Sequence, residues 1–256
     1  MNDTSGEEIK PTIDEGEKLA AEALSSDLEI YIKGINESLN LISFAIDLAP
    51  KKKLLDVRSS LKVTISLLMK MINDLRTMII LAPRGYSVQT ATIASSLYET
   101  AYTLTYIGGN DSLADEWISH TDERHTPFAS IKKITEEVIS QLFPEDYDSL
   151  FKGEYHKYTQ LCMAKHSNPL NQMLHVYKYE SNVVIAEPGP ETSEHSIRLT
   201  CFSLVNGISF ASLALGSYIN HHHHDVNSEF IKQFNELRSY YEELQNTSFL
   251  RWGNTE

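Results

Sequence analysis

Three residues that can take part in proton transfer or nucleophilic attack recur at intervals of four in the segment YTQLCMAKHSNP, residues 158–169. If this segment is helical, the interval places Tyr158, Cys162 and His166 on one helix face. A phenol, a thiol and an imidazole on one face can supply an acid, a nucleophile or a base. Half-buried side chains that only pack, with a polar tip in water, show the same pattern, so both interpretations stay open.

Glu99 is the only charged residue in the stretch 87–107. A helix without a charged solvent face is usually central in its bundle, and a carboxylate buried there is costly unless it is paired or hydrogen-bonded. We therefore expect Glu99 to be largely buried and to lie within hydrogen-bonding reach of a hydroxyl or of His166. It is either an acid satisfied by neighbouring hydroxyls or a functional acid that works with Tyr158 and His166.

Four consecutive histidines, residues 221–224, lie inside the chain in the segment SYINHHHHDVNSEF. If the preceding helix continues through them, His221, His224 and Asp225 share one face, and two imidazoles with a carboxylate can hold a divalent ion. If residues 220–225 instead connect two helices, the histidines fan apart in a solvated loop. The sequence leaves the metal site and the loop as alternatives.

The chain of 256 residues has a net charge of −13, and residues 1–29 contribute nine acidic side chains against two lysines. Because the sequence shows no dense cluster of basic residues, we expect no binding to duplex DNA. The acidic start, residues 1–14, lacks the apolar core of a signal peptide and is typical of a disordered arm. Two cysteines without a C-x-x-C pair favour a reducing compartment, so we expect a cytoplasmic protein.

Apolar residues recur every three or four positions through most of the chain, which predicts helices. We expect them at 15–48, 53–82, 87–107, 128–142, 147–166, 192–220 and 226–246. Around residues 174–187 the pattern changes to β-branched and aromatic residues that flank ESN, which indicates a β-hairpin. The predicted fold is therefore all-α: a multi-helix bundle with long antiparallel helices and one small β-hairpin insertion, formed by a single domain over residues 15–250.

Residues 201–219, CFSLVNGISFASLALGSYI, carry no charge. A membrane span has this character, but an asparagine, two glycines and four serines dilute the stretch, so we expect a buried core helix and no membrane partner. Common catalytic signatures are missing: the sequence has no H-E-x-x-H, no G-x-G-x-x-G, no phosphate-binding G-K-[ST] and no G-x-S-x-G. Whether the chain is an enzyme stays open, and the sequence names no cofactor.

The order of SSLYETAYTLTYIGGNDSLADEW (95–117), YTQLCMAKHSNP (158–169) and EPGP (187–190) resembles a bacterial all-helical family of uncharacterised function. That family has a helix with an Arg and a Glu, followed by a Tyr-x-x-Leu-Ser-x-x-x-His helix, and it is distantly similar to the HEPN superfamily of helical ribonucleases and nucleotide-binding proteins. The resemblance points to Glu99, Tyr158 and His166. Here serines stand where the family has its Arg, and Cys162 replaces the serine, which puts RNA cleavage in doubt.

Three hypotheses follow from the sequence. The first is a helical-bundle protein that acts by association, as a homodimer or with a protein partner, for example in a stress or phage response. The second is a HEPN-like ribonuclease or nucleotide-binding protein that uses Glu99, Tyr158 and His166 on RNA or a nucleotide. The third is a metal-dependent hydrolase or metal sensor that uses His221, His224 and Asp225.

Overall fold

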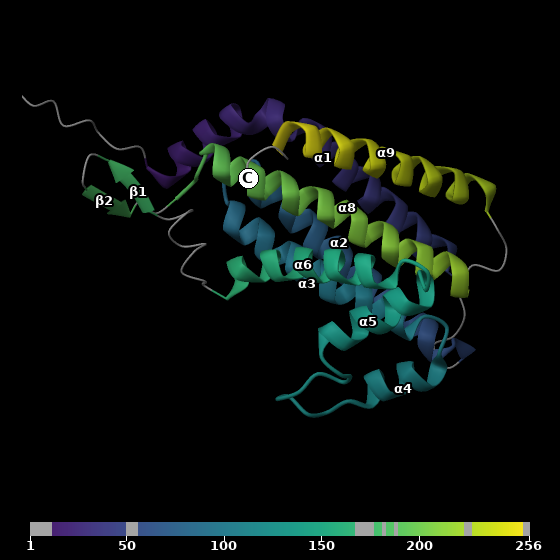
Figure 1. Cartoon of the computed structure of the whole chain (residues 1–256). Coiled ribbons are helices and arrows are strands. Elements are labelled where there is room, and N and C mark those ends of the chain that lie inside the picture. The colour runs from purple at the N-terminus through teal and green to yellow at the C-terminus, as the bar shows by residue number, and fades with distance from the viewer. Residues whose placement is uncertain are drawn as a thin grey trace, which may run out of the picture.

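The structure, a computed structural model, describes residues 12–49, 56–166, 177–180, 183–186, 189–222 and 227–252. These residues form a helical bundle, so the predicted all-α class is confirmed (Figure 1). The helices are α1 (Ile13–Leu48), α2 (Ser59–Leu81), α3 (Ser87–Ile107), α4 (Asp111–Ser119), α5 (Ile131–Leu142), α6 (Tyr147–Lys165), α8 (Glu194–His222) and α9 (Ser228–Trp252).

The first helix begins where its sequence supplies a complete N-terminal cap. The Thr12 hydroxyl accepts a hydrogen bond from the backbone N–H of Glu15, and the Glu15 carboxylate accepts one from the backbone N–H of Thr12. This reciprocal arrangement satisfies two donors that a helix start would otherwise leave unpaired. The helix thus begins two residues before the predicted position 15, and the predicted arm otherwise falls on residues 1–11, outside the described part of the chain.

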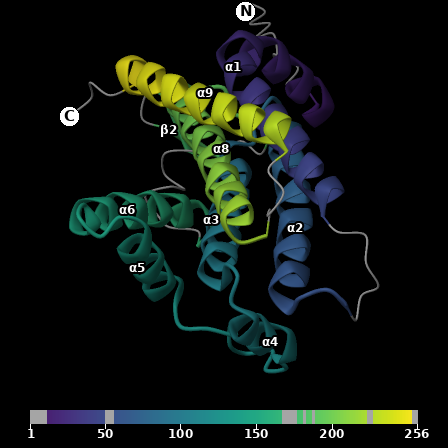
Figure 2. The ribbon, with the colours of Figure 1, turned by 90° about the vertical axis from the view of Figure 1, so that its right-hand side faces the viewer.

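Two helices without a charged outer face, α3 and α8, form the centre of the bundle. α8 packs against α3, α1 and α9, while α3 packs also against α2, α5 and α6. Figure 2 shows α8 between α5 and α6 on one side and α1 and α2 on the other, with α9 lying across it. Aromatic and aliphatic side chains that are almost fully buried fill this centre, among them Tyr98, Tyr102, Phe210, Leu68 and Met71.

α8 is the one described helix that is long and apolar enough to cross a membrane by length and composition, and 67% of its apolar stretch is buried inside the bundle. Helix α9 runs antiparallel to it (Figure 1). α8 continues to His222, two residues beyond the predicted end at 220, and α9 runs from Ser228 to Trp252 instead of from 226 to 246. The histidine run therefore begins within a helix, which the loop interpretation did not expect.

The turn between α3 and α4 requires glycine at one position. Gly108 ends α3 with φ of +47°, a conformation that side chains with a Cβ rarely adopt. A Cβ on Gly108 would also lie 3.0 Å from Nε2 of His221. Asn110 then caps α4, because its side chain accepts hydrogen bonds from the backbone N–H groups of Ser112 and Leu113.

Two four-residue strands, β1 (Tyr177–Glu180) and β2 (Val183–Ala186), pair antiparallel with Tyr177 opposite Ala186 and Glu180 opposite Val183. The two residues that join them lie outside the described part of the chain. The predicted hairpin insertion over 174–187 therefore stays a prediction, and the bundle itself is the established part of the fold.

Candidate functional site

The structure brings two of the three predicted catalytic residues together where α6 packs against α3. The Tyr158 hydroxyl donates a hydrogen bond to Oε1 of Glu99 at 2.8 Å. Nζ of Lys165 reaches the same oxygen at 2.9 Å. The predicted hydroxyl partner of Glu99 is thus confirmed, whereas deep burial was wrong because the Glu99 side chain is 37% exposed.

His166, the third predicted residue, does not join this cluster. It caps the C-terminus of α6, its backbone N–H donates to the carbonyl of Cys162, and its side chain is exposed. The reason lies in the helix pitch: with 3.6 residues per turn, a residue eight positions along is rotated by about 80° from the first. Lys165, seven positions after Tyr158, is rotated by only about 20° and meets Glu99 instead.

Lys165 is thus a site residue that reasoning from the sequence missed. An interval of seven from Tyr158 was the available signal, since two helical turns return to nearly the same face. The ion pair lies near the surface, where such a pair contributes about 0.2–1 kcal/mol to stability. With Lys165 in place, the Glu99 carboxylate accepts hydrogen bonds from two donors, Lys165 and Tyr158.

The environment of the cluster keeps the Tyr158 phenol and the Cys162 thiol protonated. Burial, followed by hydrogen bonds to Cys162 and Glu99, raises the pKa of Tyr158 far above its usual range. Burial also raises the pKa of the Cys162 thiol, against the opposing effects of the Tyr158 hydroxyl and the charge of Lys165. A neutral phenol and a neutral thiol can donate hydrogen bonds, but neither is prepared to act as a nucleophile.

Tyr158 also belongs to an aromatic stack that anchors α6 on α3. Its ring lies 4.6 Å from the ring of Tyr98, and the Tyr98 ring lies 4.3 Å from that of Tyr102. One α6 turn before Tyr158, Glu154 accepts hydrogen bonds from Tyr102 and from Lys157, at 3.2 and 2.6 Å. Burial disfavours the Lys157 charge, but Glu154 outweighs it and raises the pKa of Lys157. The polar groups named here at the contact between α3 and α6 all have hydrogen-bond partners, as expected of a contact that serves packing.

The histidine run has a different role at its first two positions. Nε2 of His222 lies 3.1 Å from the Thr64 hydroxyl and 3.2 Å from the carbonyl oxygen of Gly108. Burial lowers the pKa of His222 to about 4, and it also lowers the pKa of His221. Two neutral imidazoles therefore join the end of α8 to the α3–α4 turn.

Arg58 and Asp111 complete this junction. Arg58 donates to Asp111 at 2.9 Å and to the carbonyl of Gly109 at 2.7 Å. Donation from the side chain and backbone of Ser60, assisted by Arg58, lowers the pKa of Asp111 to about 2. Among the described residues no three His, Cys, Asp or Glu side chains cluster to hold a metal ion. His224 and Asp225 lie outside the described residues, so the metal site stays a prediction.

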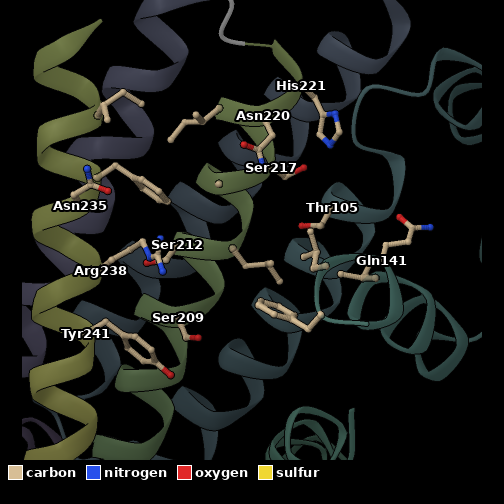
Figure 3. Close-up of a pocket in the computed structure, with 18 of the residues that line it drawn as sticks. Thr105, Gln141, Ser209, Ser212, Ser217, Asn220, His221, Asn235, Arg238 and Tyr241 are labelled. Carbon is tan, nitrogen blue, oxygen red and sulfur yellow. The ribbon is translucent and has the colours of Figure 1, made fainter. Parts of the chain in front are cut away.

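A third feature, not predicted from the sequence, is a groove over α8. The groove has a volume of about 680 Å³ and lies between α9 on one side and α3 with α5 on the other (Figure 3). We call it the α8 groove. Its floor is the face of α8 formed by Ser209, Ser212, Leu213, Gly216, Ser217, Ile219, Asn220 and His221, and its walls include Thr105, Val138, Gln141, Leu142, Phe143, Ile231, Phe234, Asn235, Arg238, Tyr241 and Glu242.

Two polar groups of the α8 groove lack partners within the part of the chain that the structure describes. The Ser217 side chain is 6% exposed, and its hydroxyl has no hydrogen-bond partner there. Arg238, which α9 contributes to the groove (Figure 3), forms no ion pair with any of these residues. A buried hydroxyl without a partner destabilises a protein by about 1–3 kcal/mol. The Ser217 oxygen is itself covered by its neighbours, so this hydroxyl does not face an occupant of the groove.

No protein-family model, curated protein sequence or solved structure matches this chain. The resemblance to the HEPN superfamily therefore stays a prediction, and functional inference rests on the geometry of the chain itself.

Proposed function

We propose that the chain acts by association, and that the partner is a second copy of the same chain bound over the α8 groove. The single observation that carries this proposal is the uncovered face of α8. The helix buries its other faces against α1 and α3, yet the residues of the groove floor at intervals of three and four remain partly exposed. A chargeless face of this kind inside a groove is typical of an interaction surface.

The side chains on this face favour protein contact. Ser209, Ser212 and Gly216 are small, so the backbone of a bound segment can approach α8 closely. The charged lining of the groove consists of Arg238 and Glu242, one of each sign. Although each chain carries a net charge of −13, the groove itself does not repel a second copy.

The test is the solution mass of the untagged chain, measured by sedimentation equilibrium across micromolar concentrations. We expect twice the single-chain mass of 29.0 kDa. The change Gly216→Leu should fill the groove and return the mass to that of one chain. Since a Cβ on Gly216 would lie 3.6 Å from Phe234, the fold accommodates the start of the new side chain.

The matched control is Gly153→Leu on α6, a glycine within a helix at which an added Cβ meets no atom within 4 Å. This variant should dimerise like the original chain. A single-chain mass at every concentration, or a dimer that survives Gly216→Leu, would contradict the proposal.

A second proposal is a ribonuclease or nucleotide-binding site at Glu99, Tyr158 and His166, as the HEPN resemblance implies. The observation in its favour is Lys165, which brings to Glu99 a cation where the sequence lacks the family's Arg. Its test is cleavage of a single-stranded RNA by the original chain, by His166→Ala and by Lys165→Ala. Activity that both changes abolish would support it, while equal and negligible cleavage by all three proteins would eliminate it.

A further inference from the structure

The turn between α5 and α6 presents an exposed apolar pair next to the α8 groove. Leu142 is 43% exposed and Phe143 is 46% exposed, and both lie on the groove wall. Pro144, Glu145 and Asp146 follow, and all three are exposed. Two adjacent large apolar side chains on a projecting turn are typical of a surface that becomes covered in an assembly.

We infer that this turn, residues 142–146, is the element that enters the α8 groove of the second copy, an inference that rests on the proposed dimer. In a two-fold symmetric dimer the same surface is used twice, so the projecting element and the cavity that receives its counterpart must belong to one surface. The turn meets this condition because Leu142 and Phe143 belong to the wall of their own groove. A two-fold axis beside that wall carries each turn across to the other groove.

Charge gives the contact its orientation. Glu145 and Asp146 form no ion pair with any described residue, and neither does Arg238 on the opposite wall of the groove. When the apolar pair of one copy lies over the small residues of α8, its two carboxylates reach the side of the groove that α9 forms. There they meet the Arg238 guanidinium of the other copy, so opposite charges that lack partners in one chain become paired in the dimer.

The receiving surface suits this occupant. Leu213, Ile231 and Phe234 supply apolar contacts for the incoming pair, and Gly216 leaves room between them. The contact would thus cover the exposed apolar pair and fill the groove at the same time.

Charge reversal tests the inference. We expect Arg238→Glu to weaken dimerisation by about tenfold or more, because two like-charged contacts replace two attractive ones. The turn variant with Glu145→Lys and Asp146→Lys should weaken it by a similar factor. The control is Lys232→Glu, an exposed change on α9 that lies outside the α8 groove and should leave the dimer unchanged.

Mixing the two charge variants gives the decisive result. A dimer of one Arg238→Glu chain and one turn-variant chain has two contacts. In one of them the original carboxylates meet the original Arg238, and in the other the two new lysines meet the new glutamate. We therefore expect heterodimers in the mixture, detected by native mass spectrometry, at concentrations where each variant alone is monomeric. No docking elsewhere on the chain predicts this rescue.

The possible outcomes separate the inference from the proposed function. If the original chain is monomeric, the proposed dimer itself fails. If the chain dimerises but neither charge variant changes the dissociation constant, association stands and the turn is not the contact. The variant Leu142→Ser with Phe143→Ser, made at two exposed positions, should also weaken the dimer by about tenfold or more, and an unchanged dimer would overturn the inference.

Discussion

α3 and α8 are similar in sequence character and different in their surroundings. Each has a long stretch without a charged stripe, and each lies at the centre of the bundle. α2, α5, α6 and α8 pack around α3, whereas α8 leaves one face open in the groove beside α9. The comparison teaches that an absence of charge predicts central position but does not distinguish complete burial from an open binding face. The distance of the neighbouring helices from each face makes that distinction.

The largest expected effect tests α3, the helix that its neighbours surround. Tyr98 on α3 is fully buried, stacks on Tyr102 and Tyr158, and meets Phe210 of α8 edge to face. Tyr98→Ala would leave a cavity at the centre of the bundle, and we expect it to lower the free energy of unfolding by about 3–5 kcal/mol, measured by urea denaturation.

The control is Tyr98→Phe, which keeps the ring and removes the hydrogen bond of 2.8 Å between the Tyr98 and Thr135 hydroxyls. It should lower the free energy of unfolding by only about 1 kcal/mol, since Thr135 still donates to its own helix. Equal losses for the two variants would show that α3 is not held by aromatic packing.

The second prediction concerns the closed end of α8. Because burial lowers the pKa of His222 from 6.5 to about 4, the unfolded chain takes up a proton at a higher pH than the folded chain does. Burial of neutral His222 therefore contributes its full stability above pH 6.5, and this contribution is lost as the pH falls from 6.5 towards 4. The His222 side chain is partly exposed, so after solvent screening we expect a loss of about 1–2 kcal/mol from this residue.

The measurement is the urea midpoint at several pH values between 7 and 4 for the original chain and for His222→Gln. This variant should lose part of the pH dependence in that window, whereas His125→Gln, at an exposed histidine, should keep it. Parallel curves for the original chain and His222→Gln would show that His222 is not held neutral in the fold.

The smallest effect sharpens the comparison within α8 itself. Gly216 on the open face has only Phe234 near an added Cβ, at 3.6 Å. At concentrations where the chain is monomeric, Gly216→Ala should therefore raise the free energy of unfolding by up to about 1 kcal/mol through helix propensity. At Gly207, on the buried side, a Cβ would lie 3.2 Å from Ile35 and 3.3 Å from Met78. Gly207→Ala should therefore bring no gain, and thermal melts of both variants check the difference.

Much of the fold could be predicted from the sequence, because helical periodicity depends only on which residues are apolar. The pattern placed both ends of α3 at the observed residues, and the error of two residues at the start of α1 reflects a cap that Thr12 and Glu15 complete. The end of α8 was missed for a tertiary reason. The sequence favours a loop at His221 and His222 because both are polar, but Thr64 and Gly108 from other elements contact them there.

The candidate site was predictable only in part. The contact of Glu99 with Tyr158 follows from a carboxylate on a chargeless helix and a four-residue pattern on another helix. The sequence did not predict that Lys165, and not His166, would contact Glu99. Three residues at intervals of four do not stay on one face, because a helix has 3.6 residues per turn. The α8 groove could not be predicted at all, since it depends on how far α5 and α9 lie from α8.

The polar side chains of α8 have a mechanical consequence. Thr200, Ser203, Asn206 and Ser212 each donate to a carbonyl four residues earlier in the same helix. None of these four bonds crosses to a neighbouring helix, so a small rotation of α8 about its own axis would break none of them. The helix is fixed by the shape of its neighbours and by the junction at its last residues. A partner bound in the groove therefore meets a floor held in place by packing, and not by hydrogen bonds from these side chains to other helices.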